Sequence, residues 1–206
     1  MSILKYLFSL VLVLVVLTNV TYAKSTDELY EEALDSFNAQ EYGKSIVLLK
    51  DIMFQNPKHL SGRILLGRSF LLSRQFKGAE NQFRQALIDG ADKRQILVSL
   101  GQSLLFQGEF ETLLETIKTD TSSTSQIEIL SMRGRAHFEL SRFVLAKNSY
   151  NDAIRIAPDN PAGYIGNAII ELKLSNLVES EVWLNKALEL DSHNAEALQL
   201  KGDMLY

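Results

Sequence analysis

The sequence predicts an all-α fold made of stacked pairs of helices, and three observations support this prediction. Two apolar stretches with helical spacing recur within each stretch of about 34 residues. A short polar break separates the two stretches, which favours a turn between antiparallel helices. A small residue returns at a fixed phase, and its intervals of 34, 33 and 68 residues separate four glycines: Gly67, Gly101, Gly134 and Gly202.

The repeats cover residues 24–206, with units beginning near 26, 60, 94, 127 and 161 and a half unit from 195. In each complete unit the second helix starts just after the polar break. The breaks are Gln40-Glu41, Arg74-Gln75, Gly108-Glu109, Ser141-Arg142 and Ser175-Asn176. An aromatic residue or leucine follows each break and is expected to pack the helix pair across the turn: Tyr42, Phe76, Phe110, Phe143 and Leu177.

The recurring small residues predict close contacts between paired helices. A glycine inside a helix is less favourable than alanine by about 1 kcal/mol, so four in one phase imply a packing benefit. Ala33 and Ala168 fill the same phase in the first and fifth units. A larger side chain at such a place would push the helices apart at a cost of about 1–3 kcal/mol.

The third unit and the end of the chain depart from the pattern. The second helix of the third unit, near residues 111–118, is expected to be short, because polar residues occupy 120–125 and loosen the joint there. The last repeat of a solenoid normally has a polar outer face, but the half unit ends with the apolar residues Leu198, Leu205 and Tyr206. We therefore expect the chain to be part of a longer array, or this end to pack on a partner or on a second copy.

Residues 1–23 have the parts of a signal peptide: Lys5, an apolar run over residues 6–17, and small residues before a cut after Ala23. The alternative is an uncleaved N-terminal anchor over residues 3–20. Either reading predicts an exported protein that is periplasmic, or anchored and facing the periplasm. Contact with the membrane is expected only through this segment, and only if it stays uncleaved.

Composition excludes several functions. The chain has no cysteine, 21 basic and 25 acidic residues, and a formal charge of −4, with no long block of one sign. Disulfides, thiolate zinc sites and a nucleic-acid groove are therefore not expected. His59, His137 and His193 lack metal-ligand spacing, and a phosphate-loop-like spacing over residues 62–69 falls inside an amphipathic helix. We predict no enzyme activity, no catalytic residue, no cofactor and no metal.

The pattern resembles the tetratricopeptide repeat, a helix–turn–helix unit of about 34 residues. The best matches are residues 60–93, with Gly67 and Phe83, and residues 127–160, with Gly134 and Tyr150. The resemblance covers residues 26–206 and implies a right-handed superhelical solenoid whose inner wall is built from the first helix of every unit. The lysines and asparagines with which some relatives clamp a peptide carboxylate are not present here.

The resemblance implies a binding groove on this inner wall for a protein partner, either an extended peptide or an amphipathic helix. Arg68 and Arg135 would fix its register, and the alternative is that the apolar wall residues only pack against neighbouring units. The predicted groove residues are Tyr30, Phe37, Ile64, Arg68, Leu71, Val98, Gln102, Leu105, Phe106, Arg135, Phe138, Ile165 and Leu172.

Residues 90–110 narrow the resemblance further, because they look like the exported multi-repeat proteins of exopolysaccharide and exosortase (PEP-CTERM) sorting systems. We therefore expect an exported scaffold for protein–protein interaction in envelope, exopolysaccharide or protein-sorting machinery. The alternative from another class is a repeat protein that binds a polysaccharide or peptidoglycan strand. The partner's identity and the oligomeric state do not follow from the sequence.

Overall fold

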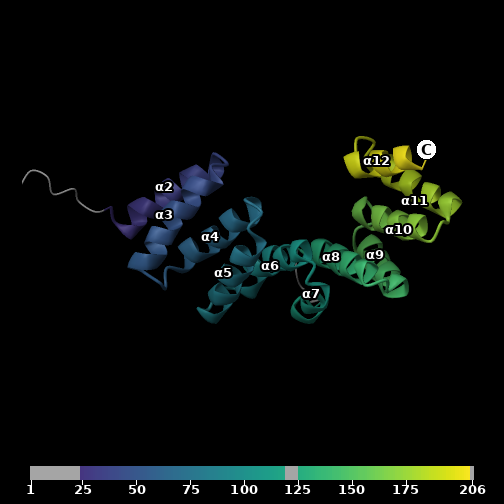
Figure 1. The fold of residues 1–206 in the computed structure, drawn as a ribbon. Helices are drawn as coiled ribbons and strands as arrows, with labels where there is room; N and C mark the ends of the chain where they lie inside the picture. The colour runs from purple at the N-terminus through teal and green to yellow at the C-terminus, as the bar shows by residue number, and fades with distance from the viewer. Residues whose placement is uncertain (1–23, 119–124, 205–206) are drawn as a thin grey trace, which may run out of the picture.

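The computed structural model describes residues 24–118 and 125–204, which form eleven helices and no strand. The helices follow one another along a curved row, with α2 and α12 at opposite ends (Figure 1). Their bounds are α2 Thr26–Asn38, α3 Tyr42–Gln55, α4 Leu60–Leu72, α5 Phe76–Ile88, α6 Lys93–Gln107, α7 Phe110–Thr116, α8 Gln126–Glu139, α9 Phe143–Ile156, α10 Ala162–Lys173, α11 Leu177–Leu190 and α12 Ala195–Asp203. The predicted all-α solenoid of helix pairs is confirmed.

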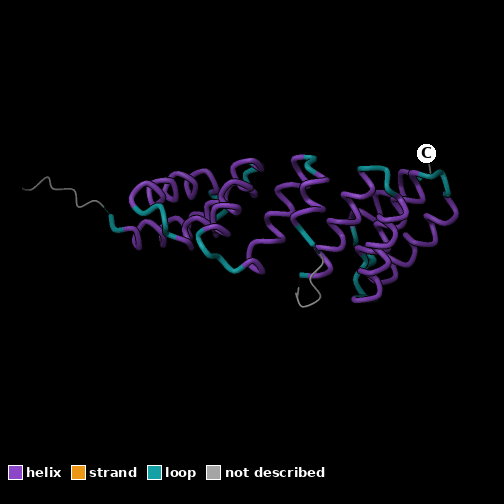
Figure 2. Tube along the Cα trace, turned by 90° about the horizontal axis from the view of Figure 1, so that it is seen from below, coloured by secondary structure: helices purple, strands orange, loops and turns teal. Residues whose placement is uncertain are grey.

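Helices pack in sequence order, each mainly against the one before it and the one after it. The first helices of the pairs, α2, α4, α6, α8, α10 and α12, begin at or next to residues 26, 60, 94, 127, 161 and 195. Seen from below, the described chain is a row of helices joined by short loops (Figure 2). The 1–23 segment and the polar stretch at 119–124 lie outside the described residues. No helix in 24–118 or 125–204 is both long and apolar enough to cross a bilayer.

Every turn inside a pair uses one residue in the left-handed backbone region. The φ angles are 62° at Gln40, 62° at Arg74, 76° at Gly108, 58° at Ser141 and 63° at Ser175. These are the first residues of the five polar breaks. Only Gly108 has no Cβ to strain, so the other four turns are held by the packing of the helices on either side.

Three of the four glycines in this phase lie in close contact with a neighbouring side chain, as predicted, and at two of them the neighbour is an aromatic ring. A Cβ added at Gly67 would lie 2.6 Å from the Phe83 ring, and one at Gly134 would lie 2.7 Å from the Tyr150 ring. At Gly101 the contact is instead with Met132 of α8, at 3.0 Å, because the shortened α7 leaves that place to the next unit. At Gly202 nothing lies within 4 Å.

The residue that follows each polar break has different packing partners in different units. Phe37 and Tyr42 pack across their own turn with ring centroids 5.6 Å apart, and Phe138 and Phe143 do so at 5.8 Å. Phe76 instead stacks on Phe106 of the next pair, at 5.0 Å. Leu177 is exposed. The expected cross-turn ring contact is therefore found in the first and fourth units only.

An arginine side chain from α8 caps the C-terminal end of the short helix α7 in the third pair. Helix α7 has seven residues, shorter than the other second helices, and Ile117 just beyond it is fully buried. Nη1 of Arg133, on α8, donates to the carbonyl oxygens of Leu114 at 3.1 Å and Ile117 at 2.7 Å. The side chain thereby satisfies carbonyls that a longer helix would have paired. Burial lowers the pKa of Arg133 from its ordinary value.

Candidate functional site

The predicted groove residues all lie on first helices, but they differ in exposure. Arg68, Phe106 and Arg135 are exposed, and Leu71 and Ile165 are buried. The half-buried ones are Tyr30, Phe37, Ile64, Val98, Gln102, Leu105, Phe138 and Leu172. Most of these pack against the core: Tyr30, Phe37, Ile64, Val98 and Leu105 against the large cluster that runs from α2 to α8, and Phe138 against the smaller cluster around Tyr150.

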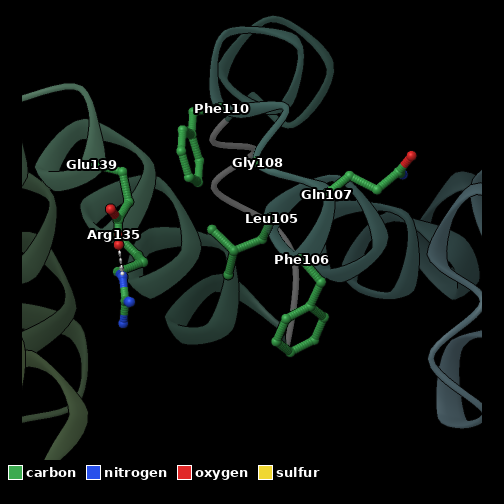
Figure 3. Close-up of a pocket in the computed structure, with 7 residues that line it drawn as sticks. All are labelled: Leu105, Phe106, Gln107, Gly108, Phe110, Arg135 and Glu139. Carbon is green, nitrogen blue, oxygen red and sulfur yellow. Dashed lines mark hydrogen bonds and ion pairs between the residues drawn. The ribbon is translucent and has the colours of Figure 1, made fainter.

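Three adjoining hollows lie along the array from α4 to α12. The central hollow has a volume of about 500 Å³ and lies between α6, α7 and α8 (Figure 3). The N-terminal hollow, about 440 Å³, lies between α4, α5 and α6, and the C-terminal hollow, about 230 Å³, lies between α8, α10 and α12. Phe106 lines the first two, and Leu105 and Arg135 line both the central and the C-terminal hollow. The hollows therefore form one continuous surface, which we call the groove.

Phe106 is the most prominent apolar side chain of the groove. It is 61% exposed and stands between the N-terminal and central hollows. Its ring stacks on Phe76 with an interplanar angle of 23°. Figure 3 shows Phe106 and Phe110 on opposite sides of Leu105. A ring held on one face and open on the other is suited to bind an apolar group of a ligand.

Positive charge flanks this aromatic ridge. Arg135 Nε donates to Glu139 Oε1 at 2.6 Å, which leaves the two terminal nitrogens without a partner among the described residues. Arg74, which lines the N-terminal hollow together with Phe106, is exposed and forms no ion pair within the described part of the chain. An acidic group on a ligand would therefore find hydrogen-bond donors beside Phe106.

The structure gathers six of the predicted residues in these hollows: Leu71, Gln102, Leu105, Phe106, Arg135 and Ile165. The other seven line none of the three: Tyr30, Phe37, Ile64, Arg68, Val98, Phe138 and Leu172. Sequence reasoning missed Arg74, Phe76, Phe110 and Tyr150, which reach the groove from turns and second helices. The aromatic residue after each polar break was a usable signal for Phe76 and Phe110, but it was assigned to packing alone.

No group of three or more histidine, aspartate or glutamate side chains within 24–118 and 125–204 is placed to hold a metal ion. The hollows are lined by apolar side chains, arginines and amides, with the carboxylates of Glu139 and Glu196 and the hydroxyls of Ser131 and Tyr150. The arrangement therefore offers contact area and hydrogen bonds to a bound segment.

Comparison with known proteins agrees with this architecture. Residues 131–195 match the family model described as tetratricopeptide repeat. A tetratricopeptide repeat protein from Parabacteroides merdae superposes with a TM-score of 0.74 over 88% of this chain and 73% of that chain, at 20% identity. The chain therefore has the fold of a tetratricopeptide-repeat solenoid. YrrB, described as a TPR protein with an unusual peptide-binding site, superposes with a TM-score of 0.66 at 14% identity, over 84% of this chain and 90% of YrrB.

A relative found by sequence comparison aligns with a smaller share of this chain than the solved structures do. The CTR9 homolog of Arabidopsis thaliana is 28% identical over 133 residues, which is 63% of this chain and 12% of that protein. This chain therefore spans about an eighth of the length of that relative.

Proposed function

We propose that the protein is a scaffold that binds a segment of a partner protein, an extended peptide or an amphipathic helix, in the groove between α4 and α12. One observation carries the proposal: three hollows adjoin one another, and the ring of Phe106, which is 61% exposed, stands between the first two. Repeat solenoids present extended concave surfaces of this kind. Exposed aromatic side chains flanked by arginine are typical of the residues that supply most of the energy of a protein interface.

A single-site crosslinking experiment tests the proposal. A photoreactive phenylalanine at position 106 should crosslink to one discrete protein in the cells of origin. The same residue at position 54 is the matched control, because Phe54 is also an exposed phenylalanine but lies on a second helix, α3. The double variant Arg74→Glu and Arg135→Glu should lose the crosslink at 106 while its helical circular dichroism is unchanged, because both arginines line hollows with Phe106. Equal crosslinking from 54 and 106 would contradict a groove site.

A polysaccharide or peptidoglycan strand is the second candidate ligand. Gln102 and Gln107 line the hollows beside Phe106, and an aromatic ring with neighbouring amides is a common way to bind sugars. Titration with peptidoglycan fragments, monitored by the change in calorimetric heat, distinguishes the two: saturable heat that disappears in Phe106→Ala would favour the glycan.

We further propose that the protein is exported and acts in envelope, exopolysaccharide or protein-sorting machinery. The support is the sequence of residues 1–23, with one lysine before an apolar run and small residues ahead of Ala23. Replacing Leu12 and Val15 with aspartate should stop export, because charge in the apolar run blocks recognition and insertion. Normal recovery of that variant from the periplasm would contradict the export proposal.

A further inference from the structure

The C-terminal hollow is smaller than the other two, and it is the one of the three that a tyrosine, Tyr150, lines. Its volume is about 230 Å³, and its apolar walls come from Leu105 of α6 and from Ile165 and Ile169 of α10. Apolar cavities of about 150 Å³ hold a benzene molecule, and sites for drug-sized ligands begin near 300 Å³. The hollow is therefore large enough for one aromatic ring and too small for a whole ligand of drug size.

Tyr150 of α9 lines this hollow and is held firmly in place. Its ring lies between two glycines: a Cβ added at Gly134 would come within 2.7 Å of it, and one at Gly166 within 2.3 Å. Tyr150 is only 5% exposed, yet its hydroxyl forms no hydrogen bond with any residue in the described ranges. Burial raises the pKa of this hydroxyl, so it stays protonated and can donate a hydrogen bond.

The corresponding ring in the second unit shows that the hydroxyl is not required for packing. Phe83 fills the space beside Gly67 in the same way and is fully buried. A phenylalanine at position 150 would make the same ring contacts with both glycines. The hydroxyl of Tyr150 is therefore not needed to fill this place, and it belongs to a residue that lines the hollow.

Charged groups surround the opening. Arg135 of α8 and Glu196 of α12 both line the hollow, and the terminal nitrogens of Arg135 have no partner in the parts of the chain described. A guanidinium at the edge of a ring-sized hollow attracts an aromatic face as well as an acidic group. Ser131, whose buried hydroxyl also lacks a partner in the described ranges, lines the same hollow.

From these observations we infer that the C-terminal hollow is an anchor site for a tyrosine side chain of the partner protein. The ring of that tyrosine lies between Leu105, Ile165 and Ile169, and its hydroxyl exchanges a hydrogen bond with Tyr150. An acidic residue next to the tyrosine contacts Arg135. This inference rests on the proposed function, since it names the residue by which the bound segment is held at the α8–α12 end of the groove.

Two small probes test the inference without a known partner: N-acetyl-tyrosinamide and N-acetyl-phenylalaninamide, which differ only in the hydroxyl. In ¹H–¹³C NMR titrations of the whole protein, the tyrosine probe should shift the methyl signals of Ile165 and Ile169 saturably. The methyl signals of Ile46 and Ile52 in the first unit serve as the internal control and should not move. The phenylalanine probe should bind the same methyl groups more weakly.

The matched variant is Tyr150→Phe, which keeps the ring and removes the hydroxyl. It should weaken the tyrosine probe by about 2- to 12-fold, as expected for one net hydrogen bond, and leave the phenylalanine probe within about twofold. Equal weakening of both probes would overturn the hydrogen bond to Tyr150. Shifts spread over both ends of the molecule, or none at Ile165 and Ile169, would overturn the site.

The two failures can be told apart. If the probe shifts are absent but position 106 still crosslinks to one protein, the tyrosine anchor is wrong and the scaffold function stands. If the probe binds as described but position 106 crosslinks to nothing, a ring-binding hollow exists and the scaffold function is wrong. A second variant, Arg135→Ala, changes an exposed side chain and should weaken N-acetyl-tyrosine, which carries a carboxylate, more than its amide.

Discussion

Gly134→Ala tests the packing that defines the solenoid at its fourth unit. The added methyl group would lie 2.7 Å from Cε1 and Cζ of Tyr150, whereas ordinary contact begins near 3.4 Å. The ring cannot move away freely, because Gly166 approaches it so closely that a methyl group there would lie 2.3 Å from Cε1. Overpacking costs about 1–3 kcal/mol, and replacing a helical glycine with alanine returns about 1 kcal/mol. Because Tyr150 is held from both sides, the overpacking cost lies in the upper part of that range, about 2–3 kcal/mol, and we expect the free energy of unfolding to fall by about 1–2 kcal/mol.

Gly202→Ala is the matched control, because it makes the same change at the same phase of the repeat where nothing lies within 4 Å. It should leave the free energy of unfolding unchanged or raise it by up to about 1 kcal/mol. Urea unfolding followed by circular dichroism gives both values, and the difference between the two variants isolates the contact with Tyr150. A Gly134→Ala protein as stable as wild type would refute the close approach of α8 and α9.

Two further predictions concern buried polar groups. Arg133→Met should lower the free energy of unfolding by about 1–3 kcal/mol, because the carbonyls of Leu114 and Ile117 lose their donor. Arg155→Met, on the exposed side of α9, is the control and should change the free energy of unfolding by less than about 0.5 kcal/mol in the same urea titration. Equal effects of the two variants would contradict the role of Arg133 in capping α7. Burial by itself raises the pKa of the Glu80 carboxyl, but hydrogen bonds from Lys77, Arg84 and Gln107 outweigh it and lower the pKa to about 2. The depressed pKa of Glu80 stabilises the fold above pH 4.5, and this stabilisation is lost as the pH falls toward 2. Glu80→Gln should therefore flatten the decline of the melting temperature between pH 4.5 and 2. An unchanged decline would contradict the hydrogen-bond network around Glu80.

Most of the fold could be read from the residues because its signals are local and repeated. The polar breaks mark turns, and the structure puts the first residue of each break in the left-handed region. The short second helix of the third unit was also visible, since residues 120–125 are polar where other units are apolar. Periodic signals of this kind accumulate over five units, so an error in one unit does not change the architecture.

The candidate site could be predicted only in part. Leu105, Phe106 and Arg135 lie on first helices and were expected in the groove, and they line it. Phe76 and Tyr150 belong to second helices, and their contribution depends on how far one pair is rotated against the next. Phe76 stacks on Phe106 of the following pair, while the equivalent Tyr42 and Phe143 stay within their own pairs. No pattern within one unit distinguishes these cases.

The amino-acid sequence determined the helix pairs, their turns and the places where glycine lets them approach, because these depend on residues close together in one unit. The tertiary structure decided which side chains remain open to a partner. Phe83 and Tyr150 fill the same place in their units, yet of the two only Tyr150 lines one of the three hollows. The helices α8, α10 and α12 leave a space beside Tyr150, whereas Phe83 is fully buried by its neighbours. Exposure is a property of the stacked array, so it follows from packing between units.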